Sequence, residues 1–160
     1  MTDPRPSIRS VLFVCTGNSC RSVMAEGFLK ERLVSLKKAD IEVHSAGVRA
    51  LGGMSPTEET VEVMREEGID VSGIRSKNVT VDMIKSSDLI LVIEPLHKDE
   101  ILNVVPAAAK KTYLLKEYGN SSKIDSGSFS VQDPIGKPME YYRACRDEIK
   151  KETERIIKGL

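Results

Sequence analysis

The chain has 160 residues, of which 40% are hydrophobic, and this is enough for one domain with a substantial buried core. Its 24 basic and 24 acidic side chains balance and form no long run of one sign, which argues against a nucleic-acid-binding or anionic-membrane-binding surface. The polar N-terminal residues and the lack of a long apolar run predict neither a signal peptide nor a membrane span. We therefore expect a cytoplasmic protein without nucleic-acid or membrane partners.

The first part of the chain predicts a tail and then alternating strands and helices. Residues 1 to 8 predict a flexible tail, and residues 9 to 160 predict one domain without repeats. An apolar run predicts a strand from Ser10 to Val14, and a three- and four-residue spacing predicts a helix that begins at Ser22. The core-facing stripe of this helix is Ala25, Phe28, Leu29, Leu33 and Leu36. An alternating pattern predicts a second strand over residues 41 to 45, closed by Ala46-Gly47.

The rest of the chain continues this alternation. Ser55-Pro56-Thr57-Glu58 combines a capping box with Pro at the first helical position, so it predicts a helix capped by Ser55 that runs to about Glu67 and stops at Gly68. Thr80 predicts the cap of a short helix over residues 81 to 86. Further strands are predicted over residues 89 to 93 and 111 to 115, and helices over residues 95 to 105 and 139 to 158.

Strands that alternate with helices in this way predict one α/β domain built on a parallel sheet. In such sheets, ligands bind beyond the carboxyl ends of the strands, at the point where the strand order reverses. The loop after the first strand is therefore the expected place of a functional site. The segment from Gly119 to Gln132 is rich in Gly and Ser and lacks periodicity, which predicts a long and functional loop.

The loop after the first strand reads Cys15-Thr16-Gly17-Asn18-Ser19-Cys20-Arg21-Ser22. No Pro interrupts it, so every amide from Thr16 to Ser22 can donate, and it leads into a helix N-terminus whose free N–H groups favour an anion. Gly17 and Asn18 tolerate the left-handed conformations that a closed ring of amides requires. We therefore predict a phosphate-binding loop with a nucleophilic cysteine.

Four residues of this loop have a predicted chemical role and a simpler alternative. Cys15 is the candidate nucleophile because it ends the strand and faces the amides, although it could be an inert buried cysteine. Arg21 could clamp phosphate with its planar guanidinium, or it could be a solvated charge on the first helical turn. Ser22 could cap the helix or donate its hydroxyl to the thiolate. Asn18 could hold the loop through its side chain or be an ordinary turn residue.

Phosphate transfer to a thiolate leaves an alcohol or an amine that needs a proton, so this chemistry requires a general acid. Asp133 is the leading candidate because the following Pro134 restricts its backbone, and because this pair ends the long loop on the expected edge of the sheet. Asp125, in the middle of the same loop, fits nearly as well on these grounds.

The remaining cysteines and the histidines give weaker indications. Cys20 could be a resolving thiol that captures an oxidised Cys15, or a partly buried bystander. Cys145 lies on the apolar stripe of the last helix with Tyr142, Ile149 and Ile156, which indicates a core residue. The three cysteines predict no disulfide framework, and His44 and His97 form no spaced cluster with them, so we expect no zinc site.

With its motifs VLFVCTGNSCRSVMAEG, SAG at residues 45 to 47 and DP at residues 133 to 134, the sequence resembles the low-molecular-weight protein tyrosine phosphatases over nearly its whole length. The resemblance implies a flavodoxin-like sheet of four parallel strands with flanking helices, no metal or other cofactor, and a covalent phosphocysteine intermediate that water hydrolyses to inorganic phosphate. Position by position, Cys15 matches the nucleophile, Arg21 the phosphate-binding arginine, and Asp133 the acid that later acts as base.

Other positions match supporting residues of the family. The resemblance implies that the loop binds phosphate through Thr16, Gly17, Asn18, Ser19, Cys20 and Ser22. Asn18, Ser22 and Ser45 match residues that brace the loop, and Cys20 matches the second cysteine that pairs with the nucleophile on oxidation. It also implies a phosphorylated protein as the substrate and a monomer or weak dimer as the assembly.

A few positions depart from the tyrosine-specific pattern. Ser19 stands where those members often carry a larger aliphatic residue, while the related bacterial protein arginine phosphatases carry a small hydroxyl residue there. Val23 replaces a usual Pro. Leu51, Met54 and the pair Ile135-Gly136 stand where aromatic residues are frequent. We expect phosphotyrosine as the substrate, with phosphoarginine as the alternative; an arsenate reductase and a phosphate-binding module without turnover are the rival functions.

Overall fold

The computed structural model describes residues 7–120 and 129–160. Most of the predicted tail lies outside the described residues, as does Asp125 in the long loop. Of the residues predicted as tail, Ile8 is described and packs in a half-buried position against the core. The described residues therefore include the whole of the first strand and of the last helix, with the residues that flank each of them.

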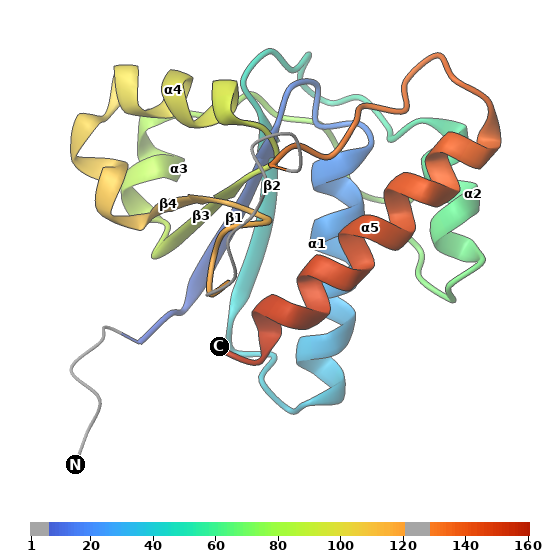
Figure 1. Ribbon diagram of the computed structural model, residues 1–160, viewed down its shortest axis with the longest axis horizontal. Helices are drawn as coiled ribbons and strands as arrows, with labels where there is room; N and C mark the ends of the chain where they lie inside the picture. Colours follow the sequence, from blue (N-terminus) through green and yellow to red (C-terminus); the bar gives the residue numbers. More distant parts are fainter. Residues whose placement is uncertain (1–6, 121–128) are drawn as a thin grey trace.

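The centre of the fold is a sheet of four parallel strands in the order β2-β1-β3-β4 (Figure 1). Its strands are β1 (Ser10–Cys15), β2 (Glu42–Gly47), β3 (Leu89–Val92) and β4 (Thr112–Leu114). The predicted parallel α/β architecture is confirmed, and the strand ends differ from the predicted ones by one or two residues. β1 extends to Cys15 because its ladder with β2 continues as far as the pair Cys15 and Gly47.

Helices cover both faces of this sheet. They are α1 (Arg21–Ser35), α2 (Glu58–Arg65), α3 (Val81–Ser86), α4 (Pro95–Val104) and α5 (Met139–Ile157), with a 3₁₀ helix, η1, at Pro106–Lys111. Figure 1 shows α1, α2 and α5 on one side of the sheet and α3 and α4 on the other. The single domain therefore has three layers.

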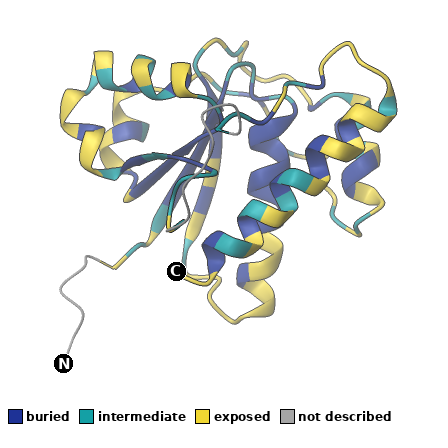
Figure 2. Cartoon of the chain, in the orientation of Figure 1, coloured by how far each residue is buried: buried dark blue, intermediate teal, exposed yellow. Residues whose placement is uncertain are grey.

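Alternating side chains of β1 supply the two halves of the core, as expected for a strand covered on both faces. Val11 and Phe13 pack with the cluster formed by α1, α2 and α5, whereas Leu12 and Val14 pack with the cluster on the α3 and α4 side. All four side chains are at most 1% exposed. Figure 2 shows that the sheet and the first turns of α1 form the most buried part of the molecule.

Helix α1 differs from the amphipathic helix that its sequence predicts. It begins at Arg21 rather than Ser22, and every residue from Arg21 to Leu29 is buried, because α5 and the sheet enclose this half of the helix. Leu36, predicted as the end of the core stripe, is instead the C-terminal cap and is 45% exposed. The apolar pattern therefore overstates the extent of the core at this end.

The start of α2 also differs from its prediction. Thr57 is the cap, since its hydroxyl accepts a hydrogen bond from the Thr60 amide at 3.2 Å, so Ser55 is not the cap and Pro56 precedes the helix. Gly68, at φ 75°, follows the helix in the left-handed conformation that commonly ends helices. Thr80 caps α3 as predicted, through a bond from the Met83 amide.

The strand order places the loop after β1 at a special point of the sheet. β1 pairs with β2 on one side and with β3 on the other, so the direction of winding reverses beside the carboxyl end of β1. Ligands of open parallel sheets bind at such points. The fold therefore places Cys15 and the following loop at the expected site.

Candidate functional site

The loop that joins β1 to α1 leaves the start of the helix open to an anion. Cys20 is the N-cap residue of α1, and no side chain accepts a capping hydrogen bond there. Asn18 has a φ of 53°, the left-handed conformation predicted for it, whereas Gly17 does not have a positive φ. Of the two residues that tolerate this conformation, Asn18 alone adopts it, so one left-handed residue is enough to turn the chain.

The end of β2 holds this loop by close backbone contacts. The Val48 and Arg49 amides donate to the carbonyl oxygens of Cys15 and Thr16, each at 2.9 Å. Gly47 lies so close that a Cβ there would overlap the Thr16 carbonyl oxygen and lie 3.0 Å from the Asn18 nitrogen. The glycine is therefore required by the approach of the loop, a role that the sequence pattern did not reveal.

A buried chain of hydrogen bonds braces the loop from below. The Asn18 side-chain amide donates to the hydroxyls of Ser22 at 2.8 Å and Ser45 at 2.9 Å, while its oxygen accepts from the Lys77 amide at 3.0 Å. The Ser45 hydroxyl in turn donates to the Glu26 carboxylate at 2.7 Å. The structure thus brings Asn18, Ser22 and Ser45 together, and it adds Glu26, a buried acid one turn after Ser22 in α1.

These donors define the surroundings of the Cys15 sulfur. Because Asn18 donates to the Ser22 oxygen, the Ser22 hydroxyl proton is free to point at the Cys15 Sγ, which lies 2.9 Å away. The backbone amide of Asn18 also donates a hydrogen bond to this sulfur, at 3.3 Å. Ser22 lies inside the helix, so it faces the sulfur and does not cap the helix. Two donors therefore converge on the sulfur, an arrangement suited to an anionic thiolate.

Arg21 is anchored at one end of its guanidinium. Its Nη1 donates to the Val131 carbonyl at 2.9 Å and lies 3.2 Å from the Glu94 carboxylate. Its Nη2 lies 3.6 Å from the Asp133 carboxylate. The residue is 2% exposed, so the alternative of a solvated charge is wrong. The edge formed by Nε and Nη2 is the part that can make two parallel bonds to a phosphate.

Asp133 reaches the loop from the far end of the chain. Its Oδ1 accepts a hydrogen bond from the Ile135 amide at 3.1 Å, and with Pro134 between them this turn fixes the carboxylate. Its Oδ2 faces Arg21, and the side chain is 43% exposed. The structure therefore brings together Cys15, Arg21 and Asp133 as the sequence predicts, while Asp125 lies outside the described residues.

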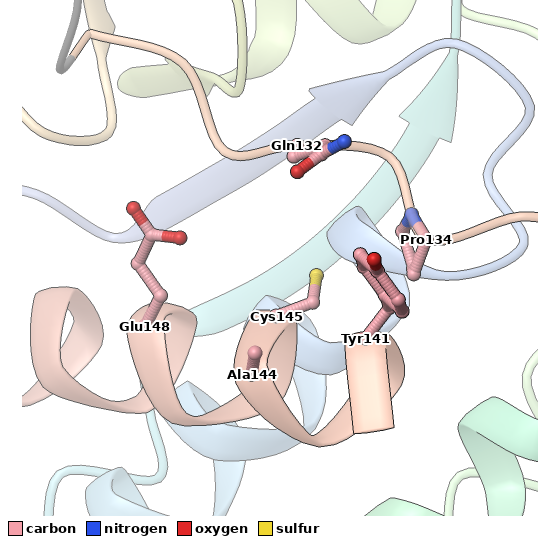
Figure 3. A pocket seen from close by; sticks show the side chains of 6 residues that line it. All are labelled: Gln132, Pro134, Tyr141, Ala144, Cys145 and Glu148. Carbon is pink, nitrogen blue, oxygen red and sulfur yellow. The ribbon is translucent and has the colours of Figure 1, made fainter. Parts of the chain in front are cut away.

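The other two cysteines have different surroundings. Cys20 is 3% exposed, with its sulfur 3.5 Å from the Thr57 hydroxyl and 3.7 Å from that of Ser19, and burial raises the pKa of its thiol. Cys145 is 4% exposed, and burial strongly raises its pKa as well. Figure 3 shows Cys145 pointing from α5 toward a pocket beneath Gln132 and Pro134. Cys145 is thus a core residue, as predicted.

The two histidines also differ. His44 is half-exposed on β2, 3.5 Å from Glu42. His97 is completely buried on the first turn of α4, where its Nε2 lies 2.9 Å from the Thr16 hydroxyl. Within residues 7–120 and 129–160, no group of three or more His, Cys, Asp or Glu side chains could hold a metal ion. His97 is a site residue that the sequence did not single out.

Three of the residues that depart from the tyrosine-specific pattern are exposed aliphatic side chains, whereas Val23 is completely buried in α1. Leu51 is 76% exposed, Met54 is 55% exposed and Ile135 is 54% exposed. Ser19 is half-buried within the loop, and its carbonyl accepts a hydrogen bond from the Thr57 amide at 3.2 Å.

None of the helices in the described part of the chain is long and apolar enough to cross a membrane.

Comparison with known proteins agrees with this geometry. The chain matches the model of the low molecular weight phosphotyrosine protein phosphatase family over residues 10–160. The chain therefore belongs to this family of cysteine-dependent phosphatases, and the resemblance seen in its motifs is confirmed.

Three relatives show the range of functions near this sequence. A protein-arginine-phosphatase of Geobacillus stearothermophilus is 35% identical over 150 residues, which cover 94% of this chain and 95% of the relative. An arsenate reductase of Staphylococcus aureus is 35% identical over 144 residues, or 89% of this chain and 91% of the relative. The crystal structure of a low molecular weight protein tyrosine phosphatase from T. tengcongensis superposes with a TM-score of 0.86 at 38% sequence identity. The match covers 94% of this chain and 99% of the T. tengcongensis chain.

Proposed function

We propose that the protein hydrolyses phosphoproteins through a phosphocysteine formed on Cys15. The observation that carries this proposal is that one loop holds the Cys15 sulfur with its two donors and the anchored guanidinium of Arg21, and that the Asp133 carboxylate lies 3.6 Å from that guanidinium. A nucleophile, an electrostatic clamp and a proton donor are the groups that phosphoryl transfer to sulfur requires.

In the first step, the Cys15 thiolate attacks phosphorus while the bond between phosphorus and the leaving group breaks. Asp133, in its protonated form, gives its proton to the departing atom. The loop amides and the free edge of Arg21 hold the phosphoryl oxygens, whose charge is spread over the equatorial plane during transfer.

In the second step, water attacks the phosphocysteine. The Asp133 carboxylate takes a proton from this water, the bond between phosphorus and sulfur breaks, and inorganic phosphate and the thiolate are released. Ser22 then donates to the sulfur again, so the leaving thiolate is stabilised by the same contact that prepares it for attack.

Replacement of Asp133 tests its role as acid. We expect Asp133→Ala to lower kcat by about 10²- to 10⁴-fold on a phosphotyrosine peptide, whose leaving group needs the proton, and by much less on p-nitrophenyl phosphate. Asp125→Ala is the matched variant and should leave both rates unchanged. If Asp133→Ala lost kcat equally on the two substrates, or if Asp125→Ala lost more, Asp133 would not be the general acid.

Phosphotyrosine is the proposed substrate residue, since the family model and the T. tengcongensis neighbour both carry that specificity in their names. The second candidate is phosphoarginine. It is favoured by the small hydroxyl residue Ser19 in the loop and by the exposed aliphatic side chains of Leu51 and Ile135, which offer less stacking surface to a phenol ring. The arginine phosphatase among the relatives agrees with this second candidate.

A rate comparison on phosphotyrosine and phosphoarginine peptides separates these two substrates, with Ser19→Ile as the test variant. If Ser19 sets the preference, the isoleucine should shift the ratio of the two kcat/KM values toward phosphotyrosine by about tenfold or more, because the larger side chain narrows the loop. An unchanged ratio would show that position 19 does not set the choice.

An arsenate reductase function is less well supported, since it would require further thiols to accept oxidation, and Cys145 is buried with a raised pKa. Oxidation could still join Cys15 to Cys20, which we propose as its redox partner. We also propose that the protein acts in the cytoplasm on phosphorylated proteins, as a monomer or weak dimer without nucleic-acid or membrane partners.

A further inference from the structure

His97, on a third element of the fold, contacts the phosphate loop and Glu94, the residue that anchors Arg21. It is the third residue of α4 and is completely buried. Its Nδ1 accepts a hydrogen bond from the Glu94 amide at 3.1 Å, and its Nε2 lies 2.9 Å from the hydroxyl of Thr16, the residue after Cys15. One imidazole therefore joins the start of α4 to the carboxyl end of β1.

The directions of these two bonds follow from the chemistry of the ring. The Glu94 amide can only donate, so Nδ1 must be the unprotonated acceptor. A neutral imidazole then carries its proton on Nε2 and donates it to the Thr16 oxygen. His97 is therefore held in one tautomer, and the hydroxyl proton of Thr16 is directed away from it.

The same ring also organises the anchor of Arg21. The Glu94 carboxylate lies 3.2 Å from Arg21 Nη1 and 3.7 Å from His97 Nε2. The backbone amide of Glu94 donates a hydrogen bond to the His97 ring, so the position of the Glu94 carboxylate depends on that ring. One buried side chain, His97, therefore helps to fix the position of Thr16 in the loop and, through Glu94, that of the anchored end of Arg21.

We propose that His97 is a positioning residue of the phosphatase reaction, which fixes the Thr16 end of the phosphate loop and, through Glu94, the orientation of Arg21. This proposal rests on the proposed function, because it concerns the same loop and clamp. The ring stays neutral near neutral pH, since burial and the charge of Arg21 lower the pKa of His97 to about 4, against the opposite effects of Glu94, Glu100 and Asp133.

The test is a double-mutant cycle on kcat with p-nitrophenyl phosphate. We expect His97→Ala and Thr16→Val each to lower kcat by about 10- to 100-fold, because small displacements of reacting groups have effects of this size. If the two residues act as a unit, the double variant should be within twofold of His97→Ala. His44→Gln, at the other and exposed histidine, is the control and should retain the wild-type rate.

Two conservative variants separate positioning from packing. His97→Asn can keep an acceptor near the position of Nδ1, and His97→Gln can keep a donor near that of Nε2, so each should recover part of the rate lost in His97→Ala. Thermal unfolding of every variant shows whether the fold is retained. If the alanine variant fails to fold, the imidazole nitrogen spectrum of the wild-type protein decides, with the proton expected on Nε2 and His44→Gln supplying the assignment.

The outcomes separate this inference from the proposed function. A wild-type protein that does not hydrolyse phosphate esters overturns the proposed function. A wild-type protein that does, together with a folded His97→Ala variant within twofold of its rate, or additive losses in the cycle, overturns the role of His97. A ring that carries its proton on Nδ1 overturns it as well.

Discussion

Glu94 and Arg21 form the closest ion pair at the described part of the loop, with 3.2 Å between the carboxylate Oε2 and the guanidinium Nη1. The two residues come from different elements, because Glu94 caps α4 and Arg21 begins α1. The pair holds one end of the guanidinium, while its other edge remains able to meet phosphate. It also places a negative charge beside the anion that the loop is proposed to bind.

Replacing this carboxylate should therefore separate turnover from phosphate binding. In Glu94→Gln, Arg21 loses its charged anchor, so we expect kcat to fall by about tenfold. The same change removes a repulsive charge, so inorganic phosphate should inhibit at lower concentration. Steady-state kinetics with phosphate as inhibitor measures both effects. Glu100→Gln, at a carboxylate that pairs with exposed Arg49, is the matched control; weaker phosphate inhibition with an unchanged kcat would contradict the anchoring role.

Gly47 should tolerate no side chain. In Gly47→Ala, the new Cβ would overlap the Thr16 carbonyl oxygen, so the loop must move and kcat should fall by about 10²-fold or more. Gly73→Ala is the control, because a Cβ there meets nothing within 4 Å. Equal rates for the alanine variants at positions 47 and 73 would show that the loop adjusts without loss.

The free energy of unfolding should decrease as pH drops through the range in which His97 is neutral in the folded protein and protonated in the unfolded chain. Burial and Arg21 lower the pKa of His97 to about 4, from an ordinary value of 6.5. Between these values the unfolded chain binds a proton that the folded protein does not, so the free energy of unfolding falls as pH drops from about 6.5 to about 4. Urea unfolding across this range measures the slope, and His97→Gln should be less steep than the wild type. Parallel pH profiles for the two proteins would be evidence against a buried neutral ring.

Glu66 should contribute in the opposite sense and at lower pH. Hydrogen bonds from Arg143 and then Arg146 lower its pKa from 4.5 to about 2, and these bonds join α2 to α5. The stabilisation is complete above about pH 4.5 and is lost as pH falls toward 2. Glu66→Gln should therefore unfold more readily than the wild type at pH 6, with a difference that shrinks toward pH 3. A constant difference would assign the effect to something other than this ionisation.

The local features of this protein could be predicted from its sequence because short-range physics determines them. The apolar runs predict every strand to within one or two residues, and Asn18, a residue type that tolerates the left-handed conformation, adopts it in the loop before α1. Thr80 is also predicted as a cap. The neighbouring prediction of Ser55 as the α2 cap fails because Thr57 offers an equally good cap two residues later.

The partners that complete the site could not be predicted in the same way. With 24 acidic residues in the chain, nothing local marks Glu94 as the anchor of Arg21 or Glu26 as the acceptor for Ser45. These contacts depend on how α4 and β2 are placed around β1. The spacing of His97 in the sequence only argues against a metal site, and its bond to Thr16 crosses 81 positions of the chain, so no local pattern reveals it.

In the proposed reaction, Cys15 carries the phosphoryl group between the two steps. The most direct measurement mixes the Asp133→Ala variant rapidly with p-nitrophenyl phosphate, follows the release of p-nitrophenol, and locates phosphate on the acid-quenched protein by peptide mass spectrometry. We expect a burst of about one equivalent with phosphate on Cys15, retained in Cys145→Ser and absent in Cys15→Ser. Hydrolysis that persists in Cys15→Ser, or phosphate found on another residue, would contradict this role of Cys15.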